Sequence, residues 1–434
     1  MNKILLYTCI FILVGFSSCD IDDQVDPNAP SINSVAENAT VQQLNLLVNG
    51  IESSMRNGLG TYVGASGSIA RELYVFDADP RNTIDVLGRE GTPLDNNTFY
   101  LTAVYNTRYS VIKTANVLLD ALDNTSSVTA AEAAGYRGFA RTVQGLMYSM
   151  VLDYLGNNGI RFDVADPENL GPFLTEAAGR QAILDLLDEA MADLGGSQFI
   201  FSLSSGFAGF DSPESMASFN RAIAARVAAR GEDYQAAMTN LSSSFFDLNG
   251  DFTVGPKHSF SLSSGDQQNP AFRPEGQSGD QFIVHNRFIE NGISGDARLA
   301  KFRERVDATS LDDLNGTHET ALYATNLSPI DIIRNEELMF IMAEARMNTG
   351  DLDGAVEVIN IIRNNNGIGD YTGGVNIDEL LDEWLFQKSY SFWGEGQLMF
   401  DLRKYGRLND SFLPIDRPGD IIHTQFPIPL SENQ

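Results

Sequence analysis

The chain has 434 residues, with 29 Lys and Arg against 58 Asp and Glu, which gives a formal net charge of −29. Such an acidic surface repels phosphate backbones and anionic lipid headgroups, so nucleic-acid binding is excluded as a function. The length suffices for a hydrophobic core that needs no disulfides, in one large domain or in two closely packed ones.

The N-terminus is typical of a bacterial lipoprotein signal. Lys3 precedes an apolar stretch, residues 4–16, which is too short to cross a hydrocarbon core of about 30 Å, and two serines then precede Cys19. A cysteine after small cleavage-site residues resembles a lipobox, in which the thiol is acylated. The only other cysteine, Cys9, lies inside the signal, so the mature chain has no disulfide or thiolate chemistry. We expect residues 1–18 to be a signal peptide and Cys19 to carry lipid; an ordinary secreted protein is the alternative.

Residues 19–40 form an acidic segment with Pro, Asn and Ser and few large apolar side chains, so we expect a flexible tether. Asp20, Asp22 and Asp23 directly follow the cysteine, where acidic residues resemble the surface-export signal of Gram-negative glycan degraders. A plain polar linker is the alternative. No later stretch reaches the roughly 18 apolar residues of a transmembrane helix, so lipid would be the only membrane attachment.

The rest of the chain alternates helical patterns with connectors rich in Gly, Asn and Ser. Apolar residues recur with the spacing of one helix face in five segments: 41–55, 105–122, 130–155, 180–194 and 213–230. Two stretches, 58–100 and 244–328, lack this periodicity and read as irregular insertions. Binding residues are usually carried by such segments on a rigid body.

An internal repeat joins two distant parts of the sequence. Residues 224–237 align with residues 343–356, with Gly231 on Gly350, and each copy reads as helix, tight glycine turn and second helix. Small residues that let two antiparallel helices approach closely resemble a tetratricopeptide repeat. The pattern predicts a mostly all-α fold, a tetratricopeptide-like helical scaffold with long irregular loop insertions.

Seven motifs, in order along the chain, resemble those of the SusD/RagB family of nutrient-uptake outer-membrane lipoproteins. They are 105–121 (YNTRYSVIKTANVLLDA), 132–154, 181–194, 294–298 (SGDAR), 330–363, 393–407 (WGEGQLMFDLRKYGR) and 426–433 (FPIPLSEN). Three positions depart from the family pattern, at Gln387-Lys388, Leu398 and Tyr405, and concern a helix-packing network rather than a ligand site. The resemblance implies a SusD-like domain over residues 41–434.

The resemblance also implies a function. The protein would bind an oligosaccharide or polysaccharide at the cell surface and deliver it to a SusC-like TonB-dependent transporter, without catalysis and without a cofactor. A peptide-binding RagB-like component is the alternative among binding proteins, and a secreted glycan hydrolase is the alternative among enzymes.

Glycan binding requires flat aromatic faces for sugar rings and polar groups for hydroxyls. Two segments combine both. The first supplies Tyr74 and Phe76 for stacking and Asp77, Asp79, Arg81 and Asn82 for hydrogen bonds. The second, within residues 265–288, supplies Asn269, Phe272, Arg273, His285, Asn286 and Arg287. The alternative is that the aromatics enter the core, that the histidine is structural and that the arginines pair with the abundant acidic residues; unpaired, the arginines would favour a carboxylate or sulfate.

Other clusters are expected to be structural. Trp384 and Trp393, the only tryptophans, are expected in the core, and the phenylalanines of residues 199–210 in a packed connector. Residues 247–251 (DLNGD) lack the spacing of a calcium loop and predict a turn. The sequence has no HExxH, GxSxG or P-loop motif, and its four histidines share no metal-ligand spacing, so no catalytic or metal site is predicted.

Overall fold

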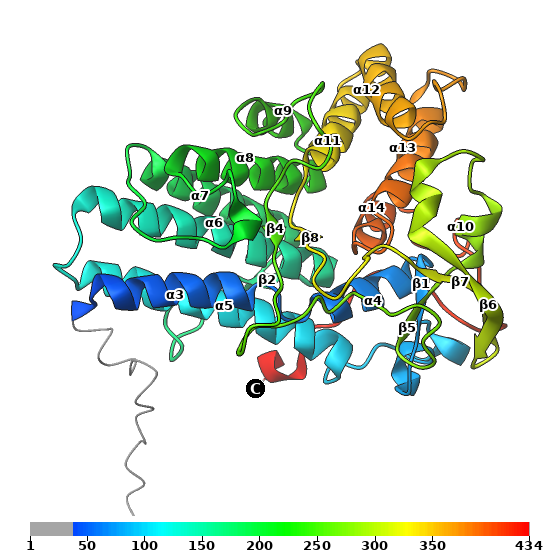
Figure 1. Ribbon diagram of the computed structural model, residues 1–434, viewed down its shortest axis with the longest axis horizontal. Helices are drawn as coiled ribbons and strands as arrows, with labels where there is room; N and C mark the ends of the chain where they lie inside the picture. The colour runs from blue at the N-terminus through cyan, green and yellow to red at the C-terminus, as the bar shows by residue number, and fades with distance from the viewer. Residues whose placement is uncertain (1–37, 434) are drawn as a thin grey trace, which may run out of the picture.

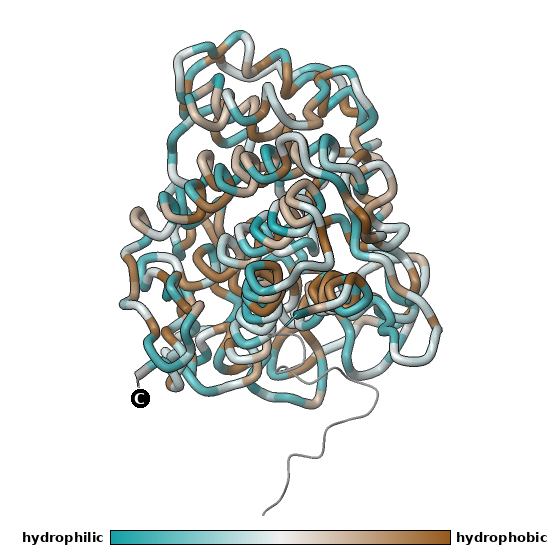
Figure 2. Tube along the Cα trace, turned by 90° about the vertical axis from the view of Figure 1, so that its left-hand side faces the viewer, coloured by the Kyte–Doolittle hydropathy of each residue, from teal (hydrophilic) through white to brown (hydrophobic). Residues whose placement is uncertain are grey.

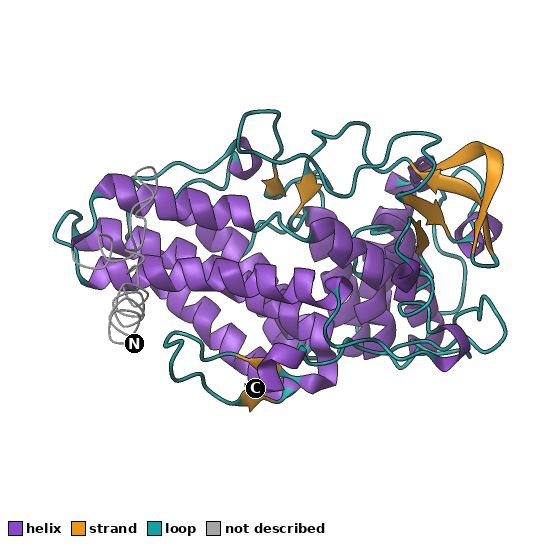
Figure 3. Cartoon of the chain, turned by 90° about the horizontal axis from the view of Figure 1, so that it is seen from below, coloured by secondary structure: helices purple, strands orange, loops and turns teal. Residues whose placement is uncertain are grey.

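The computed structural model describes residues 38–433 (Figure 1). The predicted signal peptide, the predicted lipid attachment site Cys19 and nearly all of the predicted tether lie outside the described residues. Helices fill the long body of the molecule, and the largest sheet lies at one end of it (Figures 1 and 3). Within the described range, no helix combines the length and apolar character needed to cross a membrane.

The long helices form where the sequence carries both periodicity and caps. Thr40 and Thr129 each begin a helix with a capping box, and Ser212 caps a helix that has Pro213 at its first position. The helices are α3 (Val41–Ser54), α4 (Leu59–Ile69), α5 (Phe99–Asp123), α6 (Ala130–Leu155), α7 (Glu176–Leu194), α8 (Pro213–Arg230), α9 (Tyr234–Ser242), α10 (Asn286–Glu290), α11 (Asn335–Asn348), α12 (Leu352–Asn365), α13 (Ile377–Ser391) and α14 (Leu398–Lys404). The five predicted helical segments are confirmed.

The two copies of the internal repeat are the hairpins α8–α9 and α11–α12, and α11 packs against both α8 and α9. Copies that are far apart in sequence therefore adjoin in space. Helices α5, α6, α7 and α8 pack in succession beside them. The predicted tetratricopeptide-like scaffold is thus one continuous array of helices, and the largest sheet, whose strands come from the two insertions, lies at one end of it (Figure 3).

Close packing of α6 on its neighbours depends on glycines. A Cβ added at Gly145 would lie 2.5 Å from Leu187 Cδ2 on α7, and one at Gly135 would lie 2.4 Å from the carbonyl oxygen of Gln198. Only a residue without a side chain allows these approaches. Figure 2 shows apolar and polar positions alternating along the helices, as expected for helices that bury one stripe.

The largest sheet is antiparallel with strand order β1-β5-β7-β6. Its strands are β1 (Leu73–Phe76), β5 (Gln281–Val284), β6 (Phe302–Leu311) and β7 (Leu314–Thr320), and two small pairs join β2 (Ile160–Arg161) to β3 (Phe173–Leu174) and β4 (Lys257–His258) to β8 (Ile330–Asp331). The stretches 58–100 and 244–328 are therefore not irregular throughout, because the first contains α4 and β1 and the second contains β4 to β7. Short apolar runs such as LYVF carry no helical period, so the sequence alone does not predict these strands.

The structural predictions for the aromatic residues hold. Trp384 and Trp393 are fully buried, and Phe201, Phe207 and Phe210 are buried in the connector between α7 and α8. In residues 247–251 the Gly250 N–H donates to the Asp247 carbonyl oxygen at 3.2 Å, which closes the predicted turn. Among the described residues, no three His, Cys, Asp or Glu side chains are grouped so as to hold a metal ion.

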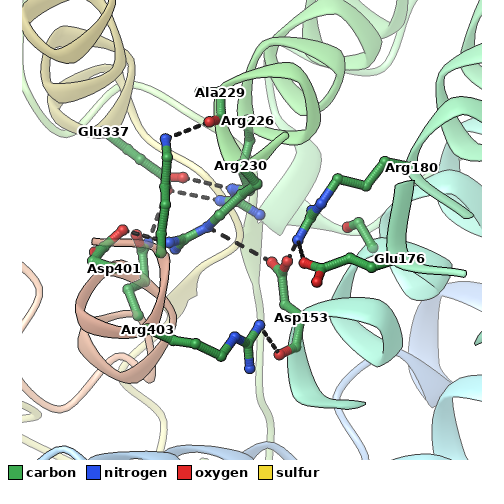
Figure 4. Close-up of polar contacts among 12 residues, drawn as sticks. Asp153, Glu176, Arg180, Arg226, Ala229, Arg230, Glu337, Asp401 and Arg403 are labelled. Carbon is green, nitrogen blue, oxygen red and sulfur yellow. Dashed lines mark hydrogen bonds and ion pairs between the residues drawn. The ribbon is translucent and has the colours of Figure 1, made fainter. Parts of the chain in front are cut away.

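A network of buried ion pairs ties the helices together (Figure 4). Arg226 on α8 forms a bidentate pair with Glu337 on α11, at 2.5 and 2.7 Å, and Arg180 on α7 lies 3.2 Å from Asp153 on α6. Arg230 pairs with Asp401 on α14. Paired charges can be buried at this helix junction because each has a partner of opposite sign.

The departures from the family pattern fit into this network. Lys388 pairs with Asp401 at 3.0 Å, the Tyr405 hydroxyl donates to Glu344 at 2.6 Å, and Gln387 accepts hydrogen bonds from Arg298 through its main chain and its side chain. These residues therefore still contact neighbouring helices.

Candidate functional site

The two segments in which the sequence predicts binding residues lie side by side. Strand β1 pairs with β5 in antiparallel register, with Tyr74 opposite Ile283. The turn after β1 and the loop before β5 therefore meet at one end of the sheet, beside the N-terminal parts of α4 and α5. A pocket of about 170 Å³ lies between them, lined by Gly60, Thr61, Gly64, Ala65, Val75, Asp77, Asn82, Phe99, Arg273, Asp280 and Phe282.

Helix α4 forms one wall of the pocket because the residues on the face that it turns to the pocket are small. Gly60 and Gly64 are one turn apart on the same face. A Cβ at Gly60 would lie 2.4 Å from the carbonyl oxygen of Pro270, and one at Gly64 would lie 3.0 Å from Val75 Cγ2. The glycines therefore let both the 270 loop and β1 lie directly against the helix.

The carboxylate of Asp77 is held at the pocket wall. Its Oδ2 accepts a hydrogen bond from Asn82 Nδ2 at 2.9 Å, and its Oδ1 accepts one from the backbone N–H of Asp79 at 2.9 Å. Asp79 caps the short 3₁₀ helix η1 (Pro80–Asn82), which begins with proline and places Asn82 opposite Asp77. Each carboxylate oxygen can accept a second hydrogen bond, so Asp77 can receive hydroxyl donors from a ligand.

Two phenylalanines line the pocket: Phe282 is buried, and the less buried one is Phe99, at the first position of α5. Its ring is partly exposed, and the guanidinium of Arg81 lies 4.9 Å from the ring centroid. Arg81 donates to both oxygens of Asp79, at 2.9 and 2.5 Å, and to Thr98 Oγ1 at 2.8 Å. The hydrogen bonds from Arg81 hold the pKa of the Asp79 carboxyl below its ordinary value. Arg81 and Asp79 thus form a paired rim beside an accessible ring.

Arg273 enters the pocket from the opposite side. Its guanidinium lies 4.1 Å from the centroid of Phe282, its Nη2 lies 3.0 Å from Asp280, and its Nη1 donates to the carbonyl oxygens of Pro270 and Phe272 at 2.9 Å. Burial lowers the pKa of Arg273, against the opposing charge of Asp280. The side chain therefore fixes the shape of the 270–282 loop as well as lining the pocket.

Tyr74 and Phe76 do not offer their rings to a ligand, which corrects the stacking role predicted for them. Each is only 5% exposed, and the two rings stack on each other with centroids 5.8 Å apart. Strand β1 is buried along all four residues. A short strand covered on both faces is a continuous apolar run, in which aromatic residues fill the core.

His285 is structural, together with a residue that the sequence did not indicate. Its Nε2 lies 2.9 Å from Oδ1 of Asp416, which also accepts from the Tyr74 hydroxyl at 2.8 Å, while Arg71 Nε lies 2.7 Å from Oδ2. Burial lowers the pKa of His285, against the effect of Asp416, so the ring is neutral at pH 7. This buried group, Arg71, Tyr74, His285 and Asp416, fixes β1 and β5 beneath the pocket.

Three other predicted residues do not line the pocket, and two of them have structural partners. Arg287 donates to the carbonyl oxygens of Ala70 and Arg71, at 3.1 and 2.8 Å, and so caps the C-terminal end of α4. Asn269 is buried and bonds to the Ser328 carbonyl oxygen at 2.8 Å. Phe272 is partly buried and does not line the pocket. Of the predicted set, Asp77, Asn82 and Arg273 line the pocket, and Asp79 and Arg81 form its rim.

Phe99, Thr61 and Asp280 line the pocket but were missed. Phe99 follows Thr98 at the start of a helix, so an aromatic residue at a helix N-terminus beside an irregular segment was the available signal. Asp280 is a neighbour of Arg273 only because the loop between them folds back. Thr61 carries no signal apart from its place among the glycines of α4.

Larger openings elsewhere have less suitable chemistry. A groove of about 660 Å³ between α7 and α8 is lined by charged and small residues and by no aromatic ring. A polar pocket of about 380 Å³ beside α3 has one aromatic residue, Phe207, whose ring is buried. The pocket at Phe99 joins an accessible ring to a fixed carboxylate.

Solved structures share this fold. A surface glycan-binding protein A from Bacteroides thetaiotaomicron, in complex with laminarihexaose, is 14% identical, with a TM-score of 0.71 over 91% of this chain and 97% of that chain. SusD superfamily proteins from Bacteroides vulgatus (16% identity, TM-score 0.65, 90% and 96% covered) and Parabacteroides distasonis (17%, 0.67, 91% and 98%) are also similar. At these identities the likeness concerns the fold. A search of curated proteins finds no match.

The fold defines a SusD-like helical protein, and residues 297–428 match the SusD family model. The match to the SusD family covers residues 297–428, and the likeness of the rest of the chain to SusD superfamily structures is one of fold. The matched residues contain α11 to α14 and their charge network, whereas the pocket is built from residues 60–99 and 273–282. The family motifs thus describe the scaffold, and the pocket lies outside the matched segment.

Proposed function

We propose that the protein binds oligosaccharide or polysaccharide at the cell surface, in the pocket lined by Phe99 and Asp77. The observation that carries the proposal is the meeting of an accessible aromatic ring with a fixed carboxylate and amide. A sugar ring presents C–H groups on its faces and hydroxyls around its edge, so it requires one flat apolar surface with polar groups beside it. The surface glycan-binding protein that shares the fold supports the same ligand class.

Paired phenylalanine variants test the pocket. Phe99→Ala removes the ring, and Phe412→Ala is its control, because Phe412 also lies against an arginine, Arg407 at 5.2 Å, but is more exposed than Phe99 and lines a different pocket. In affinity electrophoresis through a panel of neutral and acidic polysaccharides, Phe99→Ala should weaken binding about tenfold or more, since covering a phenylalanine ring contributes roughly 1.5–3 kcal/mol. Equal loss in both variants, or loss in Phe412→Ala alone, would contradict the assignment.

The proposed role is binding without catalysis, in line with the SusD family. Incubation with the bound glycan should therefore release no reducing ends. Release of reducing ends would support the hydrolase alternative. Binding of peptides with protection of residues 74–82 from proteolysis, without any effect of oligosaccharides, would support the RagB-like alternative.

We further propose that the SusD-like domain, residues 41–434, is carried on the tether of residues 19–40 by lipid on Cys19 and passes its ligand to a SusC-like TonB-dependent transporter. The wild-type protein should fractionate with outer membranes and Cys19→Ser should be released. A variant that still sediments with membranes would refute the anchor. Co-purification of the lipidated protein should recover a large TonB-dependent receptor, and failure to recover one under mild detergent would count against the partner.

A further inference from the structure

We propose that the pocket at Phe99 selects neutral sugars and rejects sugars that carry a carboxylate or a sulfate. This inference rests on the proposed glycan-binding function and concerns the substrate class. Unpaired, the three arginines in the two binding segments, Arg81, Arg273 and Arg287, would favour an anionic ligand. Their contacts in the structure point the other way.

Arg81 is already bound to a carboxylate. It holds both oxygens of Asp79, and its remaining Nη bonds to Thr98. This is the two-point geometry with which arginine recognises carboxylates, and here it is satisfied within one turn of the chain. Arg81 and Asp79 therefore form a pair without net charge at the rim, and the exposed surface of this pair adjoins Phe99.

Arg273 is occupied in the same way. Nη2 faces Asp280, Nη1 serves two backbone carbonyl oxygens, and Nε is buried away from solvent. A ligand carboxylate would have to compete with Asp280 for Nη2 of the guanidinium. Arg287 is no substitute, because it caps α4 and lines a different pocket.

The remaining charges of the pocket favour a ligand that donates hydroxyl groups. The lining has one arginine against the two aspartates Asp77 and Asp280, and the rim pair of Arg81 and Asp79 adds no net charge. Asp77 has no cationic partner among its contacts, only the Asn82 amide and a backbone N–H. An anionic sugar would thus meet a like charge in a partly desolvated pocket, whereas a neutral sugar can donate its hydroxyls to Asp77.

Matched glycans test this selectivity. Each neutral polysaccharide in a set (laminarin, pullulan, galactomannan and arabinogalactan) is compared with its own C6-oxidised derivative, and a sulfated dextran is included. Affinities come from calorimetry at one ionic strength. We expect oxidation to weaken binding at least tenfold for every member that binds, and the sulfated glycan not to bind.

Charge variants then locate the effect. Asp280→Asn releases Arg273 and should raise the ratio of oxidised to neutral affinity at least threefold. Asp123→Asn removes the same charge at the far end of α5, where Asp123 is paired with Arg137, and should leave the ratio unchanged. An acidic glycan that binds as tightly as its neutral parent, or equal ratios in the two variants, would overturn the inference alone. Failure of every glycan to bind would overturn the proposed function and the inference with it.

Discussion

The buried charge of Asp416 supports the sheet beneath the candidate pocket, and Asp416→Ala removes it. The carboxylate faces Arg71, which is 0% exposed, and accepts hydrogen bonds from Tyr74 and His285. Burial works to raise the pKa of Asp416, but the hydrogen bond from His285 and the charge of Arg71 outweigh it and hold that pKa below its ordinary value. The carboxylate is therefore ionised at neutral pH.

The cost of Asp416→Ala follows from what it leaves behind. Arg71 would remain buried without its carboxylate, and breaking one side of a buried ion pair typically costs about 3–5 kcal/mol. The hydrogen bonds from Tyr74 and His285 are lost in the same change, so their contributions fall within that figure rather than adding to it. Since whole domains are stable by only about 5–15 kcal/mol, the variant should unfold at a clearly lower denaturant concentration.

Urea unfolding followed by circular dichroism measures this cost. An unchanged slope of the free energy of unfolding against urea concentration shows that wild type and variant undergo the same unfolding reaction. The matched control is Asp123→Ala, because Asp123 and Arg137 are 2.6 Å apart, as close as Asp416 and Arg71 at 2.7 Å, but Asp123 is 70% exposed. The control should cost less than about 1 kcal/mol. A cost below 1 kcal/mol for Asp416→Ala, or equal costs for the two variants, would refute the argument from burial.

The remaining predictions concern the core. Burial raises the pKa of Glu72 from 4.5 to about 8, so the folded state keeps a proton that the unfolded state loses above pH 4.5. Between about pH 5 and 8, the free energy of unfolding of the wild type should therefore fall by roughly 1–4 kcal/mol relative to that of Glu72→Gln, as measured in thermal melts. Parallel pH profiles of the two proteins would contradict this. Gly135→Ala should destabilise by about 1–3 kcal/mol, because its Cβ meets the Gln198 carbonyl oxygen at 2.4 Å. Gly50→Ala, whose Cβ meets nothing nearer than 3.9 Å, should stabilise α3 by up to about 1 kcal/mol. If both variants changed the free energy of unfolding in the same direction, the steric explanation would be excluded.

The position of the pocket explains why the family motifs do not identify its ligand. The matched segment carries Glu337, Lys388 and Asp401, whose partners hold helices together. Those helices position the segments that carry the pocket residues. The pocket residues themselves take no part in the network of ion pairs between the helices. Residues such as Asp77 and Arg273 can therefore change without loss of the scaffold.

The sequence by itself determined the helices and their repeat. Helix periodicity and caps are local, since Thr40, Thr129 and Ser212 act on residues three positions away, and this is why the five helical segments and the hairpin turn at Gly231 could be predicted. The two binding segments were also visible as polar and aromatic residues outside that periodicity. Their composition, however, could not distinguish a ligand contact from a core contact.

Only the tertiary structure decided which side chains face the pocket. The pairing of β1 with β5 joins residues about 200 positions apart, and it buries Tyr74 and His285 against Asp416 while leaving Asp77 and Arg273 at the pocket wall. Phe99 reaches the same pocket from the first position of α5, whereas the sequence predicts the helix only from residue 105 and leaves Phe99 in the irregular stretch 58–100. Contacts between distant segments depend on the packing of the whole chain, so they carry no local signal, and the partners that they supply to Arg81, Arg273 and Arg287 decide what these arginines can bind.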